Sequence, residues 1–273
     1  MTLTTGKSGH DVAADADKLR KLHVPGDPLI LANVWDPPSA LVVESTGMRA
    51  IATASNALAP VNGYEDHGYL PVEVAFGALR RITDTVRVPV TADLEHGYGL
   101  SPEEFVDRLV GAGACGANIE DTDHRAGALV DPDQQAKRIA SIKSAARARG
   151  FDLVINARVD VHYHKGPIED GLKRARKYFD AGADCVYPIL LSDASQIREY
   201  LTLGPTNVLY GPGSIPLREL AALGVARISV ASFLLRLLLK RLQGAASALL
   251  RYDDQGFGPE WQGDLLAMKL TSG

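Results

Sequence analysis

The sequence predicts a single α/β domain built as a (β/α)8 barrel of the TIM type. Three observations predict it: short β-branched runs alternate with segments of helical period, about eight such pairs follow one another, and most connections are short. Parallel neighbours need a helical crossover, so alternation predicts a parallel sheet, and about eight units predict its closure. A chain of 273 residues is long enough for one such core, which we expect over about residues 28–250 of a single domain spanning 1–273.

The expected strands are short apolar runs bounded by turn residues, and each precedes a segment with helical period. Several helices begin with a capping signature such as Ser101-Pro-Glu-Glu, in which a side-chain oxygen accepts hydrogen bonds from free amides. The strands are Leu29–Trp35, Ala50–Ser55, Val88–Glu95, Ala117–Asp121, Leu153–Val161, Cys185–Leu190, Asn207–Tyr210 and Ala226–Ala231. The clearest helices are Pro71–Thr85, Pro102–Ala112, Pro132–Arg149, Ile168–Ala181, Ser195–Thr202, Pro216–Leu223 and Ser232–Leu250. The glycines expected to end four of them are Gly113, Gly150, Gly182 and Gly224.

Two segments depart from this regular alternation. Ala13–Leu22 has the pattern of an extra helix before the first strand, and we expect it to close the floor of the barrel. Asn56–Leu70 is polar and rich in glycine, and it is long for a connection between a strand and a helix. We therefore expect Asn56–Leu70 to be a functional loop.

Composition excludes several classes of protein. The formal charge is −4 and no dense basic stripe is present, which argues against nucleic-acid binding. The longest apolar stretch, Val230–Leu239, contains Arg236 and is too short to span a bilayer, so it predicts a buried helix and no membrane partner. The N-terminal residues lack the apolar core of a secretion signal, so we expect a cytoplasmic protein. Cys115 and Cys185 belong to no metal or redox motif and predict core packing.

Acidic residues gather at the ends of the third and fourth expected strands. Asp93 and Glu95 are two residues apart and so point to the same side of their strand, while the next strand ends on Glu120. Carboxylates that converge here would repel one another unless a cation offset them, and oxygen ligands favour Mg²⁺ or Mn²⁺. The alternative is that Asp93 and Glu95 only cap the following loop.

Arg158 follows at the end of the fifth expected strand. Its fork of donors suits a carboxylate or phosphonate of a substrate. The alternative is a purely structural pair with Asp160 or Glu120. His162 and His164 lie nearby, and we interpret them as ordinary loop histidines rather than as a metal pair.

These motifs, taken in order, resemble the isocitrate lyase/phosphoenolpyruvate mutase superfamily over about residues 29–232. The matching segments begin with Asn-Val-Trp-Asp at the first strand and include Asp93-Leu-Glu95-His-Gly-Tyr-Gly and the Glu120-Asp121 strand end. Asn-Ala-Arg158-Val-Asp, Ala-Gly-Ala-Asp184 and Leu-Gly-Val-Ala-Arg-Ile-Ser complete the set.

The resemblance implies a role for each matching position. Asp93, Glu95 and Glu120 would form a Mg²⁺ site, partly through water, with Asp66 as a further acidic position near the metal. Family members make or break a C–C or P–C bond beside a 2-oxo acid through an enolate-like species held on the metal. The substrate-binding candidates are Trp35, Ser55 and Asn56 in the turn that cradles the carboxylate, Arg158 on the oxo acid, and Asn207.

The chain departs from the family pattern at three places. Lyases of the family carry Lys-Lys-Cys-Gly-His after the fourth strand, where this chain has Thr122–Leu129 without cysteine. His124 is our candidate to replace that cysteine as acid or base, and a solvated loop histidine is the alternative. Ile189 stands where the lyases have glutamate, and Asn207–Tyr210 replaces Asn-x-Thr-Glu, so fewer polar anchors remain for a tricarboxylate.

The leading hypothesis is a Mg²⁺-dependent lyase that cleaves or forms a C–C bond beside a small 2-oxo acid, with decarboxylation as a special case. P–C chemistry, as in a phosphonomutase or phosphonopyruvate hydrolase, is the nearest alternative. A barrel that binds an oxo acid after its catalysis has decayed is a third reading.

The sequence also predicts assembly with further copies of the chain. Apolar residues surround most of Ser232–Leu250, which predicts a homodimer or homotetramer. The resemblance implies that C-terminal helices are exchanged between subunits, and the tail 256–261 would pack across the interface.

Overall fold

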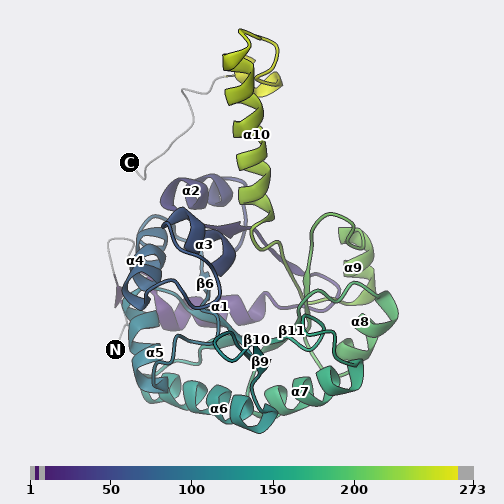
Figure 1. Ribbon diagram of the computed structural model, residues 1–273. Coiled ribbons are helices and arrows are strands. Elements are labelled where there is room, and N and C mark those ends of the chain that lie inside the picture. Colours follow the sequence, from purple (N-terminus) through teal and green to yellow (C-terminus); the bar gives the residue numbers. More distant parts are fainter. Residues whose placement is uncertain (1–3, 6–9, 264–273) are drawn as a thin grey trace.

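The computed structural model describes residues 4–5 and 10–263. Its strands form two parallel sheets with a ring of helices around them, as Figure 1 shows. The first sheet has the order β11-β10-β7-β6-β5-β4, and the second has the order β12-β13-β3. The strands are β3 (Leu29–Leu31), β4 (Asn33–Val34), β5 (Ile51–Thr53), β6 (Val90–Asp93), β7 (Gly116–Glu120), β10 (Val154–Val159), β11 (Cys185–Pro188), β12 (Asn207–Leu209) and β13 (Arg227–Ser229).

The two sheets are linked at both ends. β3 and β4 follow one another with only Ala32 between them, so one continuous segment contributes to both sheets. At the other end, an isolated parallel bridge joins Val186 of β11 to Thr206, directly before β12. Every strand of both sheets pairs in parallel with its neighbours, as the alternation in the sequence predicts.

Helices follow the strands and cover the outer side of the sheets. Several carry the predicted caps: the Ser101 side chain accepts from the amide of Glu104, and the Asp131 side chain accepts from the amides of Asp133 and Gln134. The helices are α2 (Pro37–Ser45), α4 (Val72–Thr83), α5 (Pro102–Gly111), α6 (Pro132–Ala148), α7 (Ile168–Asp180), α8 (Ala194–Leu201), α9 (Leu217–Leu223) and α10 (Phe233–Leu250).

The predicted N-terminal helix is α1 (Val12–Lys21), and it lies against the amino ends of the strands. Its Leu19 is fully buried beside Gly116 at the start of β7. Arg20 reaches the carboxylate of Asp184, which directly precedes β11, at 2.8 Å. A strand pair, β1 (Thr4–Thr5) and β2 (His10–Asp11), precedes α1.

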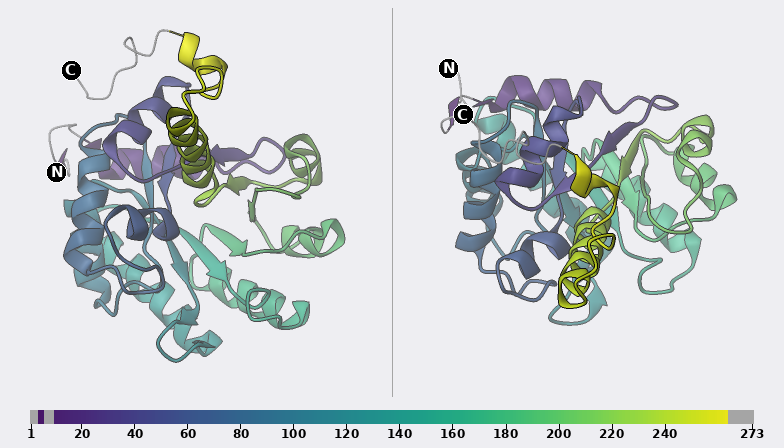
Figure 2. Two further views of the ribbon diagram at one scale, coloured as in Figure 1. Left: turned by 45° about the horizontal axis from the view of Figure 1, so that its top comes forward. Right: turned by 90° about the horizontal axis from the view of Figure 1, so that it is seen from above.

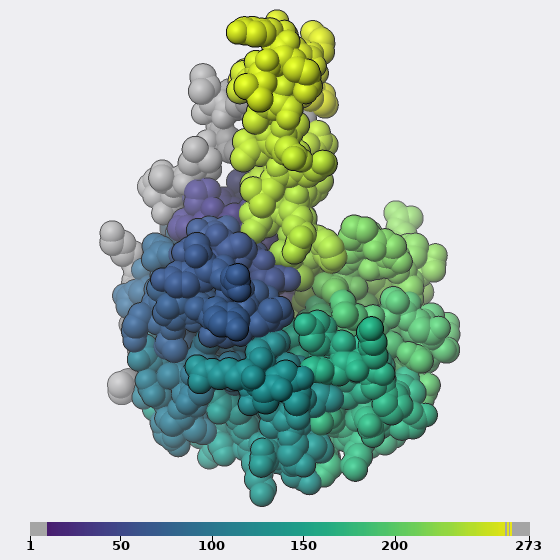
Figure 3. Space-filling model, viewed as in Figure 1, coloured from purple at the N-terminus to yellow at the C-terminus, as the bar shows by residue number. Residues whose placement is uncertain are grey.

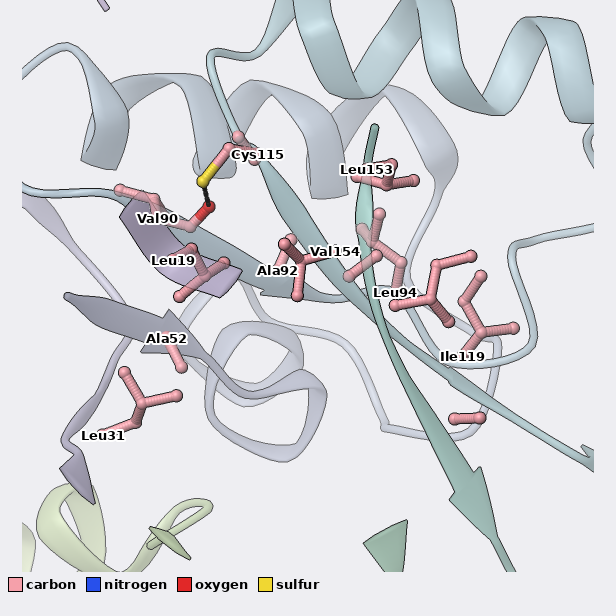
Figure 4. Close-up of a cluster of buried hydrophobic side chains, with 14 of the residues drawn as sticks. Leu19, Leu31, Ala52, Val90, Ala92, Leu94, Cys115, Ile119, Leu153 and Val154 are labelled. Carbon is pink, nitrogen blue, oxygen red and sulfur yellow. Dashed lines mark hydrogen bonds between the residues drawn. The ribbon is translucent and has the colours of Figure 1, made fainter. Parts of the chain in front are cut away.

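Alanine and branched aliphatic side chains fill the space between strands and helices. Figure 4 shows Leu19 of α1 near Val90, Ala92 and Ala52 of the neighbouring strands. Both cysteines are free and buried, as predicted, and the thiol of Cys115 donates to the carbonyl of Val90 at 3.4 Å. This apolar packing holds the carboxyl ends of the strands in fixed positions.

The structure corrects the prediction for Asn56–Leu70 in part. The first half of this segment forms the helix α3 (Ser55–Val61), and only the remainder is a loop. The reason is that Ala57, Leu58 and Ala59 are apolar and fit the core, where all three are buried. The segment after β7 also gains structure, as a hairpin of β8 (Thr122–Asp123) and β9 (Ala128–Leu129).

Helix α10 stands out from the body of the molecule, as Figures 1 and 2 show. The space-filling view in Figure 3 shows the same projection from the surface. Among the described side chains of this helix, Leu235 and Ala248 are buried. Across the described part of the chain, no helix combines the length and apolar character that crossing a membrane requires.

Candidate functional site

A cavity of about 170 Å³ opens where the parallel strands end. The carboxyl ends of β5, β6, β10, β11, β12 and β13 all contribute lining residues, as expected for a ligand site in this class of fold. Its lining combines polar side chains with aliphatic and aromatic ones. The lining residues are Asn33, Ala54, Ser55, Asn56, Asp66, His67, Asp93, Asn118, Arg158, Tyr163, Tyr187, Ile189, Leu190, Leu209, Ser229 and Ala231.

Asp93 lies at the end of β6 and joins two strands at the cavity wall. Its Oδ2 accepts a hydrogen bond from the amide of Ser55 at 3.0 Å, and its own amide donates to Oγ1 of Thr53 at 2.9 Å. The backbone amide of Ser55 is therefore hydrogen-bonded to Asp93 in this structure. Burial raises the pKa of Asp93, and Arg158 opposes that rise.

Glu95, His96 and Glu120 form a cluster that could hold a metal ion. One potential ligand atom from each lies within 4.8 Å of the others. Glu95 is 1% exposed, and neither of its carboxylate oxygens makes a hydrogen bond of good geometry with a described residue, while the nearby Tyr98 hydroxyl only partly offsets the rise in its pKa. Nδ1 of His96 and Oδ1 of Asp66 are also buried without a described partner. Four unsatisfied polar atoms in this region fit a bound cation, because burying such groups without a partner is costly.

The pKa values around this cluster show the same crowding of negative charge. Burial, together with the neighbouring carboxylates of Asp66, Glu120 and Asp93, raises the pKa of Glu95 to about 8. Burial likewise raises the pKa of Glu120. A divalent ion would favour the ionised forms and offset this repulsion.

Arg158, at the end of β10, is held by two protein carboxylates. Its guanidinium binds Asp160 through Nε at 2.6 Å and Nη2 at 2.9 Å, and it binds Glu120 through Nη1 at 2.6 Å. Burial lowers the pKa of Arg158, and the carboxylates of Glu120 and Asp160 outweigh that effect and raise it. Three of its five donors are used in this way, so two remain for a ligand in the cavity.

His124 lies on the β8–β9 hairpin beside the cluster rather than in the cavity lining. Its Nε2 is hydrogen-bonded to Oε1 of Glu120, which raises the pKa of His124 against the effect of burial. Its ring lies 4.5 Å from that of His67, centroid to centroid. The hairpin and the loop that carries His67 therefore meet over the acidic cluster.

The structure brings most of the predicted site residues together. Ser55, Asn56, Asp66, Asp93 and Arg158 line the cavity, and Glu95, Glu120 and His124 lie beside it.

Trp35 and Asn207, also predicted to bind substrate, do not line the cavity. Trp35 packs against Ala54, Ala57 and Leu235. Asn207 is fully buried and donates to Oγ of Ser229 at 3.0 Å.

Each of the two loop histidines predicted to be ordinary is hydrogen-bonded to another side chain of the protein. His162 pairs with the hydroxyl of Tyr200 at 3.1 Å, and His164 pairs with Oγ1 of Thr122 at 3.1 Å.

Sequence reasoning missed three residues of this region: His96, Asn118 and Arg227. His96 directly follows Glu95, so adjacency was the available signal. Asn118 precedes Glu120 by two residues, and strand alternation places it on the same side. Arg227 lies inside an apolar run, where a charged residue is unusual.

Comparisons with known proteins agree with this geometry. The sequence model of the phosphoenolpyruvate phosphomutase family matches residues 19–250. An uncharacterized protein of Mycobacterium tuberculosis is 35% identical over 216 residues, 77% of this chain and 80% of the relative. A 2-methylisocitrate lyase of Aeropyrum pernix is 31% identical over 191 residues, 67% of this chain and 60% of the relative.

A solved structure gives the same result. The crystal structure of 2,3-dimethylmalate lyase has 25% sequence identity and a TM-score of 0.79, with 90% of this chain and 88% of that chain covered. The order of motifs along the sequence predicts the same relationship. The chain belongs to the phosphoenolpyruvate phosphomutase family, and so to the isocitrate lyase/phosphoenolpyruvate mutase superfamily of lyases and mutases.

Proposed function

We propose that this chain is a Mg²⁺- or Mn²⁺-dependent lyase that breaks, or in reverse forms, a C–C bond beside a small 2-oxo acid. Decarboxylation of such an acid is a special case of the same chemistry. The observation that carries the proposal is the buried carboxylate of Glu95, which makes no hydrogen bond of good geometry with a described residue and lies beside a cavity lined by Asp93 and Arg158. Unsatisfied acidic groups next to a cationic side chain suit an anionic ligand that shares a metal ion.

Glu95 and Glu120 would hold the metal, with Asp93 and Asp66 contributing directly or through water. His96 adds a nitrogen donor within reach of both glutamates, a ligand that Mn²⁺ accepts more readily than Mg²⁺ does. When bound, the ion supplies Lewis acidity that stabilises negative charge on a carbonyl oxygen of the substrate.

The polar part of the cavity lining would orient the acid. The two free donors of Arg158 suit its carboxylate, and Ser55 and Asn56 line the wall beside it. Asp160 holds the guanidinium plane in place through two hydrogen bonds. His124 would move the proton, and its position outside the lining requires either motion of the hairpin or a bridging water.

The apolar part of the cavity lining favours a small, partly apolar substrate. Ile189, Leu190 and Leu209 contribute to it with two tyrosines, and Arg158 is the one arginine among the lining residues. A phosphonate or a tricarboxylate would bring further negative charges to this surface without donors to meet them. C–C chemistry on a small oxo acid is therefore favoured over P–C chemistry, which the family name also covers.

A direct comparison of substrates tests the proposal. Purified protein with Mg²⁺ or Mn²⁺ is assayed for 2-oxo-acid release from branched malates, for oxaloacetate consumption and for turnover of phosphonopyruvate. We expect turnover of one of the C–C substrates and its loss after exhaustive EDTA treatment, with recovery when Mn²⁺ is restored. Faster turnover of phosphonopyruvate would instead assign the P–C alternative, and full activity after EDTA would refute the metal site.

We further infer that the two sheets close into one eight-stranded barrel and that the chain is a single domain. Three observations support closure: the β13–β3 pairing, the bridge between Val186 and Thr206, and the continuity of β3 with β4.

We also propose that the protein assembles as a homodimer or homotetramer through α10. Large apolar side chains on this helix are exposed, and a second copy of the chain is the partner that would cover them. They include Leu237, Leu238, Leu239, Leu242, Leu249 and Leu250.

A further inference from the structure

Arg227 is a fully buried cation for which the described residues provide no carboxylate partner. It lies on β13 at the centre of the molecule. Its Nη2 donates to Oδ1 of Asn118 at 3.0 Å, its Nε approaches Oγ of Ser229 at 3.5 Å, and Nη1 has no hydrogen-bond partner among the described residues. An unpaired charge in the protein interior raises the free energy of the folded state, so we expect a negatively charged group to compensate it.

Another buried cation among the described residues is arranged differently. Lys143 is 2% exposed, and its ammonium lies 2.8 Å from Asp152 and 3.0 Å from Asp184. It also donates to the carbonyl of Leu153, directly before β10, so it lies at the amino ends of the strands. Lys143 is thus neutralised by protein carboxylates, whereas Arg227 is not.

Arg227 lies directly beneath the cavity, because both of its hydrogen-bond partners line it. Asn118 and Ser229 are lining residues at the carboxyl half of β7 and at the end of β13. The compensating negative charge for Arg227 can therefore come from a ligand in the cavity, at short range and through a medium of low dielectric constant.

Arg227 also fixes the orientation of the Asn118 side chain. Oδ1 of Asn118 accepts from Arg227 and from Nδ2 of Asn156, the latter at 2.8 Å. A guanidinium can only donate, so the atom that faces it must be the amide oxygen. Nδ2 of Asn118 makes no hydrogen bond to any described residue and is left as a donor for the cavity.

We propose that Nδ2 of Asn118 donates a hydrogen bond to an oxygen of the bound acid, and that Arg227 is the positioning residue behind it. Arg227 holds the amide in the donating orientation, polarises it, and adds positive potential to the cavity floor. This inference rests on the proposed function, since it requires an anionic oxo acid in the cavity. It adds a recognition element from β7 and β13 to the groups on β6 and β10.

A double-mutant cycle tests the proposal, with oxalate binding to the Mg²⁺-supplied protein measured by calorimetry. Asn118→Ala and Arg227→Met should each weaken oxalate by about tenfold (~1.4 kcal/mol). The double variant should lose little more than either single variant, because Arg227 acts through Asn118. Fully additive losses, or wild-type affinity in Arg227→Met, would overturn the proposal.

Thermal unfolding separates this role from a purely structural one. Arg227→Met replaces an unpaired buried charge with an apolar chain, so its melting temperature should be unchanged or higher while affinity falls. Lys143→Met is the matched control: it removes a buried cation that Asp152 and Asp184 share and leaves Arg20 as their common partner, away from the site. Its melting temperature should fall while oxalate affinity stays at the wild-type value. If Arg227→Met does not fold, Arg227→Gln removes the charge, keeps a donor, and should lose affinity in the same direction.

Titration of the wild-type protein with oxalate distinguishes a failure of the proposed function from a failure of the role proposed for Arg227. If wild-type protein with Mg²⁺ does not bind oxalate, the proposed function fails, and this inference fails with it. If wild-type protein binds oxalate and the Arg227 variants bind it equally well, only the role of Arg227 is refuted.

Discussion

At the scale of single residues, the site holds its side chains in backbone conformations that ordinary residues avoid. Glu95 has φ +51°, Leu190 has φ +65° and Ala231 has φ +47°, and each lines or borders the cavity. His67, with φ +73°, belongs to the same group. Such conformations cost about 1–3 kcal/mol each and persist where packing imposes them, which is common at functional sites. Glu95, which has one of these conformations, also belongs to the cluster with His96 and Glu120.

The first prediction concerns Glu120 as a metal ligand. Glu120→Gln keeps the shape of the side chain and removes its charge, while Arg158 retains its two hydrogen bonds to Asp160. We expect the fold to persist and Mn²⁺ affinity to fall by at least about tenfold. Mn²⁺ titration followed by electron paramagnetic resonance measures the affinity, and Asp133→Asn on the surface of α6 is the control. Wild-type Mn²⁺ affinity in Glu120→Gln would remove Glu120 from the ligand set.

The second prediction separates proton transfer from binding. His124→Ala should lower kcat by roughly 10²–10⁴-fold, the usual contribution of general acid–base catalysis, with little change in oxalate affinity. Arg158→Ala should weaken oxalate by at least about tenfold as well, because its charge meets the acid in both ground and transition states. Steady-state kinetics and calorimetry on both variants give the comparison. Wild-type turnover in His124→Ala would assign the proton to another group or to water.

The order of the strands made part of the site predictable. Asp93 ends β6 and Glu120 ends the neighbouring β7, so their proximity followed from the sequence, whereas Glu95 lies beyond β6 at φ +51°, where strand alternation no longer applies. The sequence offered Asp160 or Glu120 as alternative partners of Arg158, and the structure shows that Arg158 binds both, which depends on side-chain geometry across two strand ends. The environment of Arg227 likewise depends on contacts with a residue 109 positions away.

At the scale of elements, the sequence was informative where a local pattern decides the structure. Helix ends at Gly113 and Gly224 were predictable because both adopt positive φ, +80° and +97°, which glycine accepts readily. The helix α3 was missed because its seven residues are too few to show a period, and burial of its alanines decides it. The hairpin β8–β9 has two residues in each strand, below the length at which alternation is visible.

Helix α1 is attached to the body through a buried ion pair. Nδ1 of His10 lies 2.5 Å from Oδ2 of Asp15, and Nε2 of the same ring lies 3.0 Å from the carbonyl of Val86. The hydrogen bond to Asp15 raises the pKa of His10 against the effect of burial. For Asp15, burial raises the pKa, and the bonds to His10 and Lys18 outweigh it and lower the pKa.

The third prediction is a loss of stability above neutral pH that depends on His10. Its folded-state pKa is raised above 6.5, so its stabilisation is fully present below about pH 6.5 and is lost as pH rises through the raised value. Urea unfolding at about pH 6 and about pH 9 measures the loss, which should be smaller in His10→Ala. His162→Ala is the control: burial lowers the pKa of His162, so this variant should show a larger loss. Equal losses in wild type and His10→Ala would contradict the assignment.

At the scale of the whole molecule, the exposed apolar surface is concentrated on α10 and beside it. An apolar groove of about 360 Å³ lies between α2 and α10, with Trp35, Val42, Leu234 and Leu238 among its lining residues. Leu238 belongs both to this groove and to the exposed leucines of α10, so two copies related by a twofold axis could each offer both a ridge and a groove. In the proposed assembly, Trp35 would pack at the interface.

The last prediction is that the protein is a dimer or tetramer at micromolar concentration and that α10 holds it together. Leu238 and Leu242 are 54% and 61% exposed, and covering such side chains is worth about 1.5–3 kcal/mol each. Replacing both with glutamate should therefore dissociate the assembly, since a charge in an apolar interface also repels its symmetry mate. Sedimentation velocity measures the oligomeric state, and Lys137→Gln on the exposed face of α6 should sediment as the wild type does. A wild-type monomer would refute the assembly, and a Leu238→Glu/Leu242→Glu variant that stays oligomeric would place the interface elsewhere. Oxalate binding by the dissociated subunits would show that one chain forms the whole site, whereas loss of binding on dissociation would show that a second copy completes it.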